Sequence, residues 1–135
     1  MSGFESETET ALPSSSLVYN TYVIVFDMDV HLLSAAADEL RALPVPERRA
    51  MLNALEKLQV IGPQLPYPHS SQVKTSALRE LRPRAGRSPW RALYRQVGDQ
   101  LIILAIVPEA QHDPRGFRRG LATAEERLAD YEEVL

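Results

Sequence analysis

Two periodicities of hydrophobic and polar positions in the first third of the chain predict a strand followed by a helix. Residues 18–26, VYNTYVIVF, are β-branched and aromatic, and this composition predicts a first strand. The run stops at Asp27 and Asp29, whose carboxylates can cap a helix that follows. Apolar residues then recur at helical spacing from Val30 to Leu43 and predict that helix.

A second helix and a long surface loop are predicted next. The helical pattern opens at Pro46 and ends near Gly62, since proline favours the first turn of a helix and glycine its end. The two helices should therefore form a hairpin. Residues 62–71, GPQLPYPHSS, contain three prolines and two adjacent serines and predict a loop that leads from the helices to a sheet.

Three short strands are predicted in the second half of the chain. They cover residues 77–84, 89–97 and 100–107, and turn residues at 85–88 and 98–99 separate them. Gly98 and Asp99 separate the last two strands and are typical of a tight hairpin turn. The strands should therefore form a small, mostly antiparallel sheet.

The pattern ends in an amphipathic helix and completes an α+β domain. Acidic residues occupy one face of this helix, and apolar residues share the other. The apolar residues are Leu121, Ala124, Leu128 and Tyr131. The predicted order is β-α-α-β-β-β-α, in one domain over residues 19–135. Residues 1–18 are rich in Ser, Thr and Glu, and we expect a disordered acidic tail there.

Composition excludes several classes of protein. The chain has no cysteine, so no disulfide, thiol nucleophile or thiolate metal site is possible. Its first residues lack a basic segment followed by an apolar one, and no apolar run approaches the roughly 18 residues that span a membrane. We therefore expect a cytoplasmic protein without membrane contact.

Charge is unevenly distributed along the chain. Residues 74–119 hold ten basic and four acidic side chains, a net of +6, whereas the chain as a whole has a net charge of -3. This segment is a candidate surface for a polyanion such as RNA. The alternatives are that its arginines pair with carboxylates elsewhere in the chain, or that the opposite charges serve self-association.

Most catalytic chemistries find no support in the sequence. The imidazoles of His31, His69 and His112 are far apart in sequence and lie in no recognisable triad or metal-ligand spacing. Glycine-rich phosphate loops are missing. We therefore expect neither a metal nor another cofactor.

The arginines of the predicted sheet are the remaining candidates for chemistry. Alternation divides them between the two faces, so that Arg82 and Arg84 share one parity while Arg79 takes the other. A guanidinium can bind phosphate in a bidentate manner and stabilise a pentacovalent phosphorane. Cleavage of RNA by its own 2′-OH needs no protein nucleophile, only a base, an acid and such an electrostatic clamp.

Three sequence motifs together suggest a family. The run LRELR, residues 78–82, is followed after a turn by WRALY, residues 90–94, and then by the apolar strand LIILAIV. In this order the motifs resemble the HigB-like, phage Gp49-related branch of the RelE/ParE toxin superfamily. The resemblance extends from Met28 to Tyr131 and implies a RelE-like fold.

The resemblance also implies a function. Such relatives are toxins of type II toxin-antitoxin pairs that cleave mRNA, often on the ribosome, and are silenced by an antitoxin that frequently has a helix-turn-helix. By position, Arg82 and Arg91 match the arginines of the two strand motifs and are expected to act in catalysis. The residues expected to contact RNA are Lys74, Arg79, Arg84, Arg87, Tyr94 and Arg115. Tyr94 is equally suited to be a core aromatic.

The chain departs from the resemblance after the last strand. Many relatives carry a lysine pair there, whereas this chain has Glu109 and Ala110 at roughly those places. His112 is then the candidate proton-transfer group, because an imidazole changes its charge near neutral pH. The alternatives are a chain that keeps the fold without cleaving RNA, and one that inhibits a protein target such as DNA gyrase.

Overall fold

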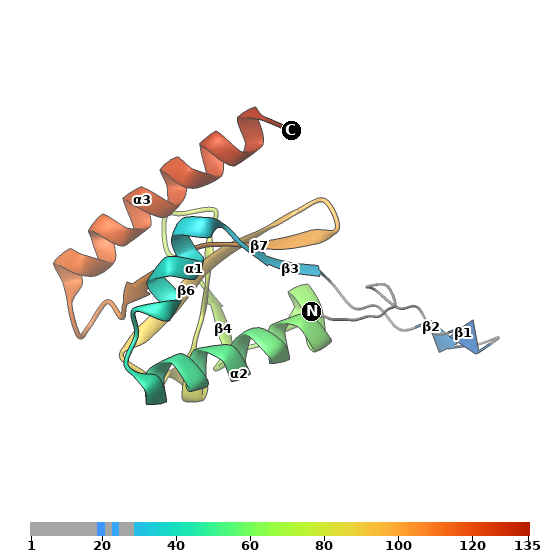
Figure 1. Cartoon of the computed structure of the whole chain (residues 1–135), viewed down its shortest axis with the longest axis horizontal. Helices are drawn as coiled ribbons and strands as arrows, with labels where there is room; N and C mark the ends of the chain where they lie inside the picture. Colours follow the sequence, from blue (N-terminus) through green and yellow to red (C-terminus); the bar gives the residue numbers. More distant parts are fainter. Residues whose placement is uncertain (1–18, 21–22, 25–28) are drawn as a thin grey trace.

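A five-stranded mixed sheet with helices on both faces forms the body of the computed structural model (Figure 1). The structure describes residues 19–20, 23–24 and 29–135, so the tail predicted over residues 1–18 lies outside the described residues. The strand order is β3-β7-β6-β5-β4, with β3 parallel to β7 and the other pairs antiparallel. The strands are β3 (Asp29–Leu32), β4 (Ser70–Gln72), β5 (Arg79–Leu81), β6 (Trp90–Val97) and β7 (Gln100–Pro108). The predicted α+β class is confirmed.

The first strand of the sheet lies later in the sequence than predicted. It is β3, and the described parts of residues 18–26 form only a two-stranded ribbon of β1 (Tyr19–Asn20) and β2 (Val23–Ile24). Val30 and Leu32 are half-buried in β3 and alternate with exposed neighbours, so they belong to a strand and not to the predicted helix. Helix α1 begins only at Ser34 without a side-chain cap, so the predicted cap by Asp29, which lies in β3, is wrong. Asp27, the other predicted cap, lies outside the described residues.

The helical hairpin is confirmed. Helix α1 (Ser34–Arg41) and α2 (Val45–Ile61) are joined by a short turn, and Pro46 lies in the first turn of α2 as expected. A 3-10 turn, η1 (Gly62–Gln64), follows. The predicted loop over residues 62–71 is wrong at its end, where Ser70 and Ser71 belong to the short edge strand β4. The neighbouring prolines favoured a loop in the sequence.

Two apolar cores fill the space between the sheet and its helices. The first lies between the hairpin and one face of the sheet and includes Met51, Leu58 and Leu81. The second lies under the terminal helix α3 (Pro114–Glu133), with Leu93 and Leu104 from the sheet. No described helix is both long and apolar enough to span a membrane.

The close crossing of α3 over β7 requires a glycine. A Cβ atom added to Gly120 would lie 2.2 Å from Cγ1 of Val107 and 2.8 Å from its Cβ. We expect Gly120→Ala to lower the free energy of unfolding by about 1–3 kcal/mol, although alanine favours helices by about 1 kcal/mol. Urea unfolding measures this loss. Adding Val107→Ala to Gly120→Ala should restore part of the lost stability. An increase in the stability of Gly120→Ala alone would contradict the close contact.

Two side chains form hydrogen bonds with the backbone of β7 beyond the point where its pairing with β3 ends. The backbone N–H of Ile106 donates to Glu39 Oε1 at 3.0 Å, and the carbonyl of Leu104 accepts from Arg127 Nη1 at 2.8 Å. Glu39 and Arg127 also pair with each other, with Nη2 2.9 Å from Oε2. This ion pair therefore satisfies backbone groups that would otherwise lack partners.

Candidate functional site

The loops at one end of the sheet gather several of the predicted site residues. Strand β5 ends where β6 begins, since Leu81 pairs with Ala92, and β7 ends beside the same point, since Trp90 pairs with Pro108. The loops over residues 66–69, 82–89 and 109–113 therefore meet at this end. We call it the site end.

A carboxylate joins two arginines at the site end. The Glu80 oxygens lie 3.6 Å from Nη1 of Arg82 and 3.6 Å from Nε of Arg91. Ser71 donates its hydroxyl to the same carboxylate at 3.0 Å. The three charged side chains are largely enclosed, with exposed fractions of 17% for Glu80, 18% for Arg82 and 3% for Arg91.

Arg82 is fixed from several sides yet keeps contact with solvent. Its Nε donates to the carbonyl of Pro68 at 2.9 Å, and its guanidinium carbon lies 5.0 Å from the ring centroid of Tyr67. Tyr67 is itself 69% exposed. A Cβ atom at Gly86 would lie 2.5 Å from Arg82 Nη2, so glycine leaves room for the guanidinium. Arg82 therefore offers an oriented cation beside an exposed aromatic ring.

Arg91 is buried and braces the loop before β6. Its guanidinium donates to the carbonyls of Ser88 at 2.8 Å, Trp90 at 3.0 Å and Gly86 at 3.1 Å. Removal from water lowers the pKa of Arg91, and the nearby charge of Arg82 lowers it further. In this arrangement the guanidinium faces protein carbonyls, and its predicted part in catalysis stays a prediction.

A second arginine ties the same loop to the helical hairpin. Within the 3-10 turn η2 (Pro83–Gly86), Arg84 and Ala85 have positive φ, at 54° and 55°. Nη1 of Arg84 contacts both oxygens of Glu47, at 2.7 and 2.8 Å, and Ser88 donates its hydroxyl to Glu47 at 2.9 Å. Arg84 therefore forms the kind of internal ion pair that the sequence left open as an alternative.

The ion pair gives Glu47 a pH-dependent role. The hydrogen bond from Arg84 lowers the pKa of Glu47 below its ordinary value of 4.5, despite partial burial. Because the carboxyl group has a lower pKa in the folded chain than in the unfolded chain, it stabilises the fold at pH values above its pKa in the unfolded chain. This stabilisation is lost as the pH falls through the pKa of the folded chain. We expect Glu47→Gln to cost about 1–2 kcal/mol at pH 7 and almost nothing near pH 2. Urea unfolding at both pH values tests this, and a constant difference would contradict it.

The loop after β7 is shaped by Glu109. Its backbone N–H donates to the carbonyl of Pro89 at 2.8 Å, and its carboxylate accepts from the backbone N–H groups of Gln111 and His112 at 2.9 and 3.0 Å. Asp113 then caps α3 by accepting from the N–H of Gly116 at 3.0 Å. His112 is exposed at the site end, and Arg115 is exposed in the first turn of α3.

Other predicted residues lie apart from this end or inside the protein. Lys74 is exposed in the turn between β4 and β5, at the opposite end of the sheet. Tyr94 is buried, its hydroxyl 2.5 Å from that of Ser70, and Arg79 donates Nε to the same Ser70 at 3.1 Å. Tyr94 thus takes the core position that the sequence left open. Arg87, in contrast, is exposed at the site end.

Three residues of the site were not predicted from the sequence. Tyr67 lies in the proline-rich segment, where an aromatic ring between two prolines was the available signal. Glu80 is part of the quoted LRELR motif, yet only the structure connects it with both arginines. Glu47 is distant in sequence from Arg84 and gave no signal. The described residues contain no group of three or more His, Asp or Glu arranged to hold a metal ion.

The fold is that of a RelE-like domain. The structure is similar to the E. coli toxin RelE with two arginine-to-alanine substitutions in the free state, with a TM-score of 0.50 and 13% identity over 70% of this chain and 98% of that one. It is also similar to a chain of the Mycobacterium tuberculosis toxin-antitoxin complex RelBE2, with a TM-score of 0.46 and 21% identity over 62% and 93%.

The family follows from the sequence match. The model of the phage-derived Gp49-like proteins matches residues 38–109, and the chain belongs to this family. No curated protein sequence matches the chain. The matched residues run from α1 to the end of β7 and include Glu80, Arg82 and Arg91.

Proposed function

We propose that this protein is the toxin of a type II toxin-antitoxin pair and an endoribonuclease that cleaves mRNA, in association with the ribosome. Its membership of the Gp49-like family and its RelE-like fold support this proposal. We further propose a cognate antitoxin with a helix-turn-helix as its partner and the cytoplasm as its location. A bound cofactor is not required for the chemistry.

The observation that carries the proposal is the pairing of Arg82 with Tyr67. Single-stranded RNA is bound by aromatic rings that stack on bases and by cations that contact phosphates. Here an exposed ring and an oriented guanidinium lie 5.0 Å apart. Exposed Arg87 and Arg115 add positive charge at the same end. Together they suit a short stretch of single-stranded RNA.

The proposed reaction is transesterification within the RNA. The 2′-oxygen attacks the adjacent phosphorus, the bond from phosphorus to the 5′-oxygen breaks, and the products end in a 2′,3′-cyclic phosphate and a 5′-hydroxyl. Arg82 stabilises the added negative charge of the phosphorane. His112 is the candidate to accept the 2′-OH proton or to donate one to the leaving 5′-oxygen. Glu80 orients Arg82 through its carboxylate.

The test is cleavage of a defined mRNA by the purified full chain, alone and in a translation extract. We expect fragments with cyclic phosphate and 5′-hydroxyl ends, more abundant when ribosomes are present. Intact mRNA in both settings, with folded protein and measured RNA binding, would refute the nuclease. The ends of the fragments separate this reaction from contaminating nucleases that leave 5′-phosphates.

A second candidate is a domain of the same fold that does not cleave RNA. Two observations favour it: Glu109 stands at roughly the place of an expected lysine, and the Arg91 guanidinium faces loop carbonyls. Such a protein would inhibit a protein target such as DNA gyrase. A supercoiling assay with purified gyrase distinguishes the two, because inhibition without RNA cleavage would support the second candidate.

A further inference from the structure

The imidazole of His69 lies beside Arg82 at the site end. His69 is the last residue of the loop before β4, and its carbonyl accepts from the backbone N–H of Arg82 at 2.9 Å. This hydrogen bond lies one residue beyond the register that pairs Ser70 with Leu81. Residues opposite each other in an antiparallel pair have Cβ atoms about 4.5–5.5 Å apart on the same face of the sheet. His69 and Arg82 are therefore neighbours across the strands.

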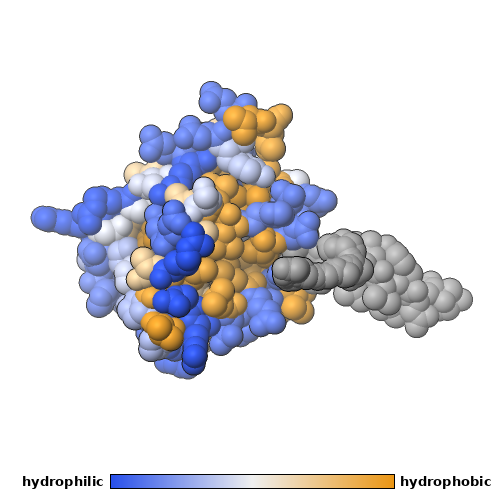
Figure 2. Space-filling view, viewed as in Figure 1, coloured by the Kyte–Doolittle hydropathy of each residue, from blue (hydrophilic) through white to orange (hydrophobic). Residues whose placement is uncertain are grey.

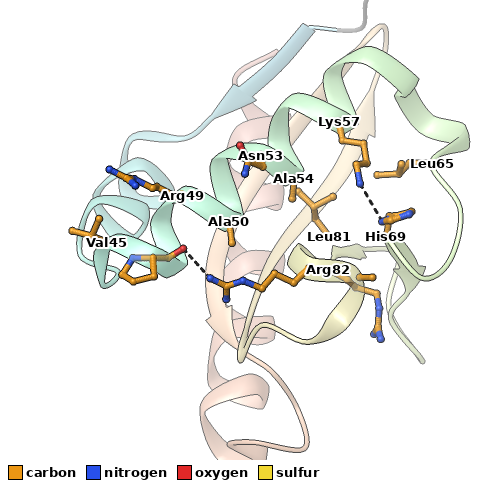
Figure 3. A pocket seen from close by; sticks show the side chains of 13 residues that line it. Val45, Arg49, Ala50, Asn53, Ala54, Lys57, Leu65, His69, Leu81 and Arg82 are labelled. Atoms are coloured by element: carbon orange, nitrogen blue, oxygen red, sulfur yellow. Dashed lines mark hydrogen bonds between the residues drawn. The ribbon is translucent and has the colours of Figure 1, made fainter.

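A third polar side chain shares the pocket of these two residues. The pocket has a volume of about 500 Å³, and Lys57 of α2 lines it together with His69 and Arg82 (Figure 3). On the face seen in Figure 2, hydrophilic side chains surround an apolar area. Lys57 is exposed and His69 half-buried, so solvent reaches both side chains. None of the thirteen described lining residues is acidic, so no lining carboxylate neutralises the cations of the pocket.

Lys57 selects one tautomer of His69. Its Nζ lies 3.5 Å from Nδ1 of the imidazole. An ammonium group only donates hydrogen bonds, so Nδ1 accepts, and Nε2 carries the hydrogen of a neutral imidazole. Within the described part of the chain, no residue accepts a hydrogen bond from Nε2. The Nε2–H group is therefore available to a ligand held on Arg82.

We infer that His69 is the general acid of the RNA cleavage, an inference that rests on the proposed function. With an RNA phosphate on Arg82, Nε2 gives its proton to the 5′-oxygen as the bond from phosphorus to that oxygen breaks. Nδ1 takes a proton from the ammonium group of Lys57, so the imidazole stays neutral and Lys57 becomes an amine. The amine regains a proton from water after the products leave. His112 is then left to accept the proton of the 2′-OH.

The test replaces the leaving 5′-oxygen by sulfur at the mapped cleavage site of one RNA. A thiol is a much stronger acid than an alcohol, so a thiolate leaves without being protonated. His69→Ala should slow cleavage of the oxygen RNA about a hundredfold or more, and of the sulfur RNA less than about threefold. Single-turnover rates of the purified full chain are compared in the setting, with or without ribosomes, in which the wild type cleaves. Fast cleavage of the sulfur RNA also shows that the variant is folded.

Lys57 acts through His69 and has a test of its own. Lys57→Met should slow cleavage of the oxygen RNA about tenfold and, again, hardly affect the sulfur RNA. The ¹⁵N chemical shifts of the His69 ring in the free protein report its tautomer. We expect the hydrogen on Nε2 in the wild type and a mixture of both tautomers in Lys57→Met. A hydrogen on Nδ1 in the wild type would overturn the proton path from Lys57.

Matched variants separate the outcomes. His31 is an exposed imidazole on β3, at the opposite edge of the sheet from β4, and His31→Ala should cleave both RNAs at the wild-type rate. Arg82→Ala should slow both, because a phosphorane forms with either leaving group. Wild-type cleavage of the oxygen RNA by His69→Ala, or equal losses on both RNAs, would overturn the inference while the nuclease stands. Failure of the wild-type protein on both RNAs would refute the nuclease and, with it, the general acid.

Discussion

Replacement of Arg91 by alanine is expected to lower the free energy of unfolding by about 3 kcal/mol. The substitution removes three hydrogen bonds to the carbonyls of Gly86, Ser88 and Trp90 and leaves Glu80 with one cation fewer. Buried acceptors without partners cost about 1–3 kcal/mol each, partly offset because burial of the arginine itself is costly. Urea unfolding with a fixed slope measures the change.

Arg95→Ala is the matched control for this prediction. Arg95 lies on the same strand and donates a single hydrogen bond to the carbonyl of Ala77, at 3.1 Å. Its loss should cost about 1 kcal/mol or less. Equal costs for the two substitutions would show that Arg91 does not brace the loop. A loss of toxicity in Arg91→Ala therefore reports on catalysis only after its folding has been measured.

Replacement of Arg82 by alanine is expected to reduce RNA cleavage by about a hundredfold or more. Removing one oriented donor from a developing anion typically costs this much. Arg82→Lys keeps the charge but loses the planar fork and its packing over Tyr67, so we expect about a tenfold loss. Single-turnover cleavage of one mRNA at saturating protein isolates this effect from binding.

Two controls protect the interpretation. Arg95 pairs with Ile102 toward the other end of the sheet. The Arg95→Ala variant should therefore cleave RNA at the wild-type rate. Tyr67→Ala should weaken RNA binding about fivefold or more, since it removes a stacking surface. Wild-type cleavage by Arg82→Ala would remove Arg82 from the mechanism.

Long and strongly patterned elements could be predicted from sequence. Helix α2 repeats its apolar positions over several turns, and β7 contains a continuous apolar run. Gly98 and Asp99 mark the hairpin between β6 and β7. The segment around Val30 and Leu33 fits both a strand and a helix, because its apolar spacing satisfies either period over so few residues. This segment forms a strand because it pairs with β7, which lies far away in the sequence.

The segment that carries the candidate site could be proposed from the sequence, but the directions of its side chains could not. Strand parity placed Arg82 and Arg84 on one side, yet Arg84 turns toward Glu47 because the backbone of η2 adopts positive φ at three successive residues. Of these residues only Gly86 favours such a conformation. The direction of the Arg91 side chain depends on this same loop. Rotamers set by an irregular loop cannot be read from periodicity.

The ion pair between Glu39 and Arg127 also bears on how the protein behaves in a crowded solution. An open strand edge invites an incoming strand from another molecule and so promotes aggregation. The N–H of Ile106 and the carbonyl of Leu104 already form hydrogen bonds with side chains, so they cannot pair with an incoming strand. At the opposite edge, β4 is only three residues long. The part of β7 beyond β3 and the short edge strand β4 therefore both discourage strand addition between copies.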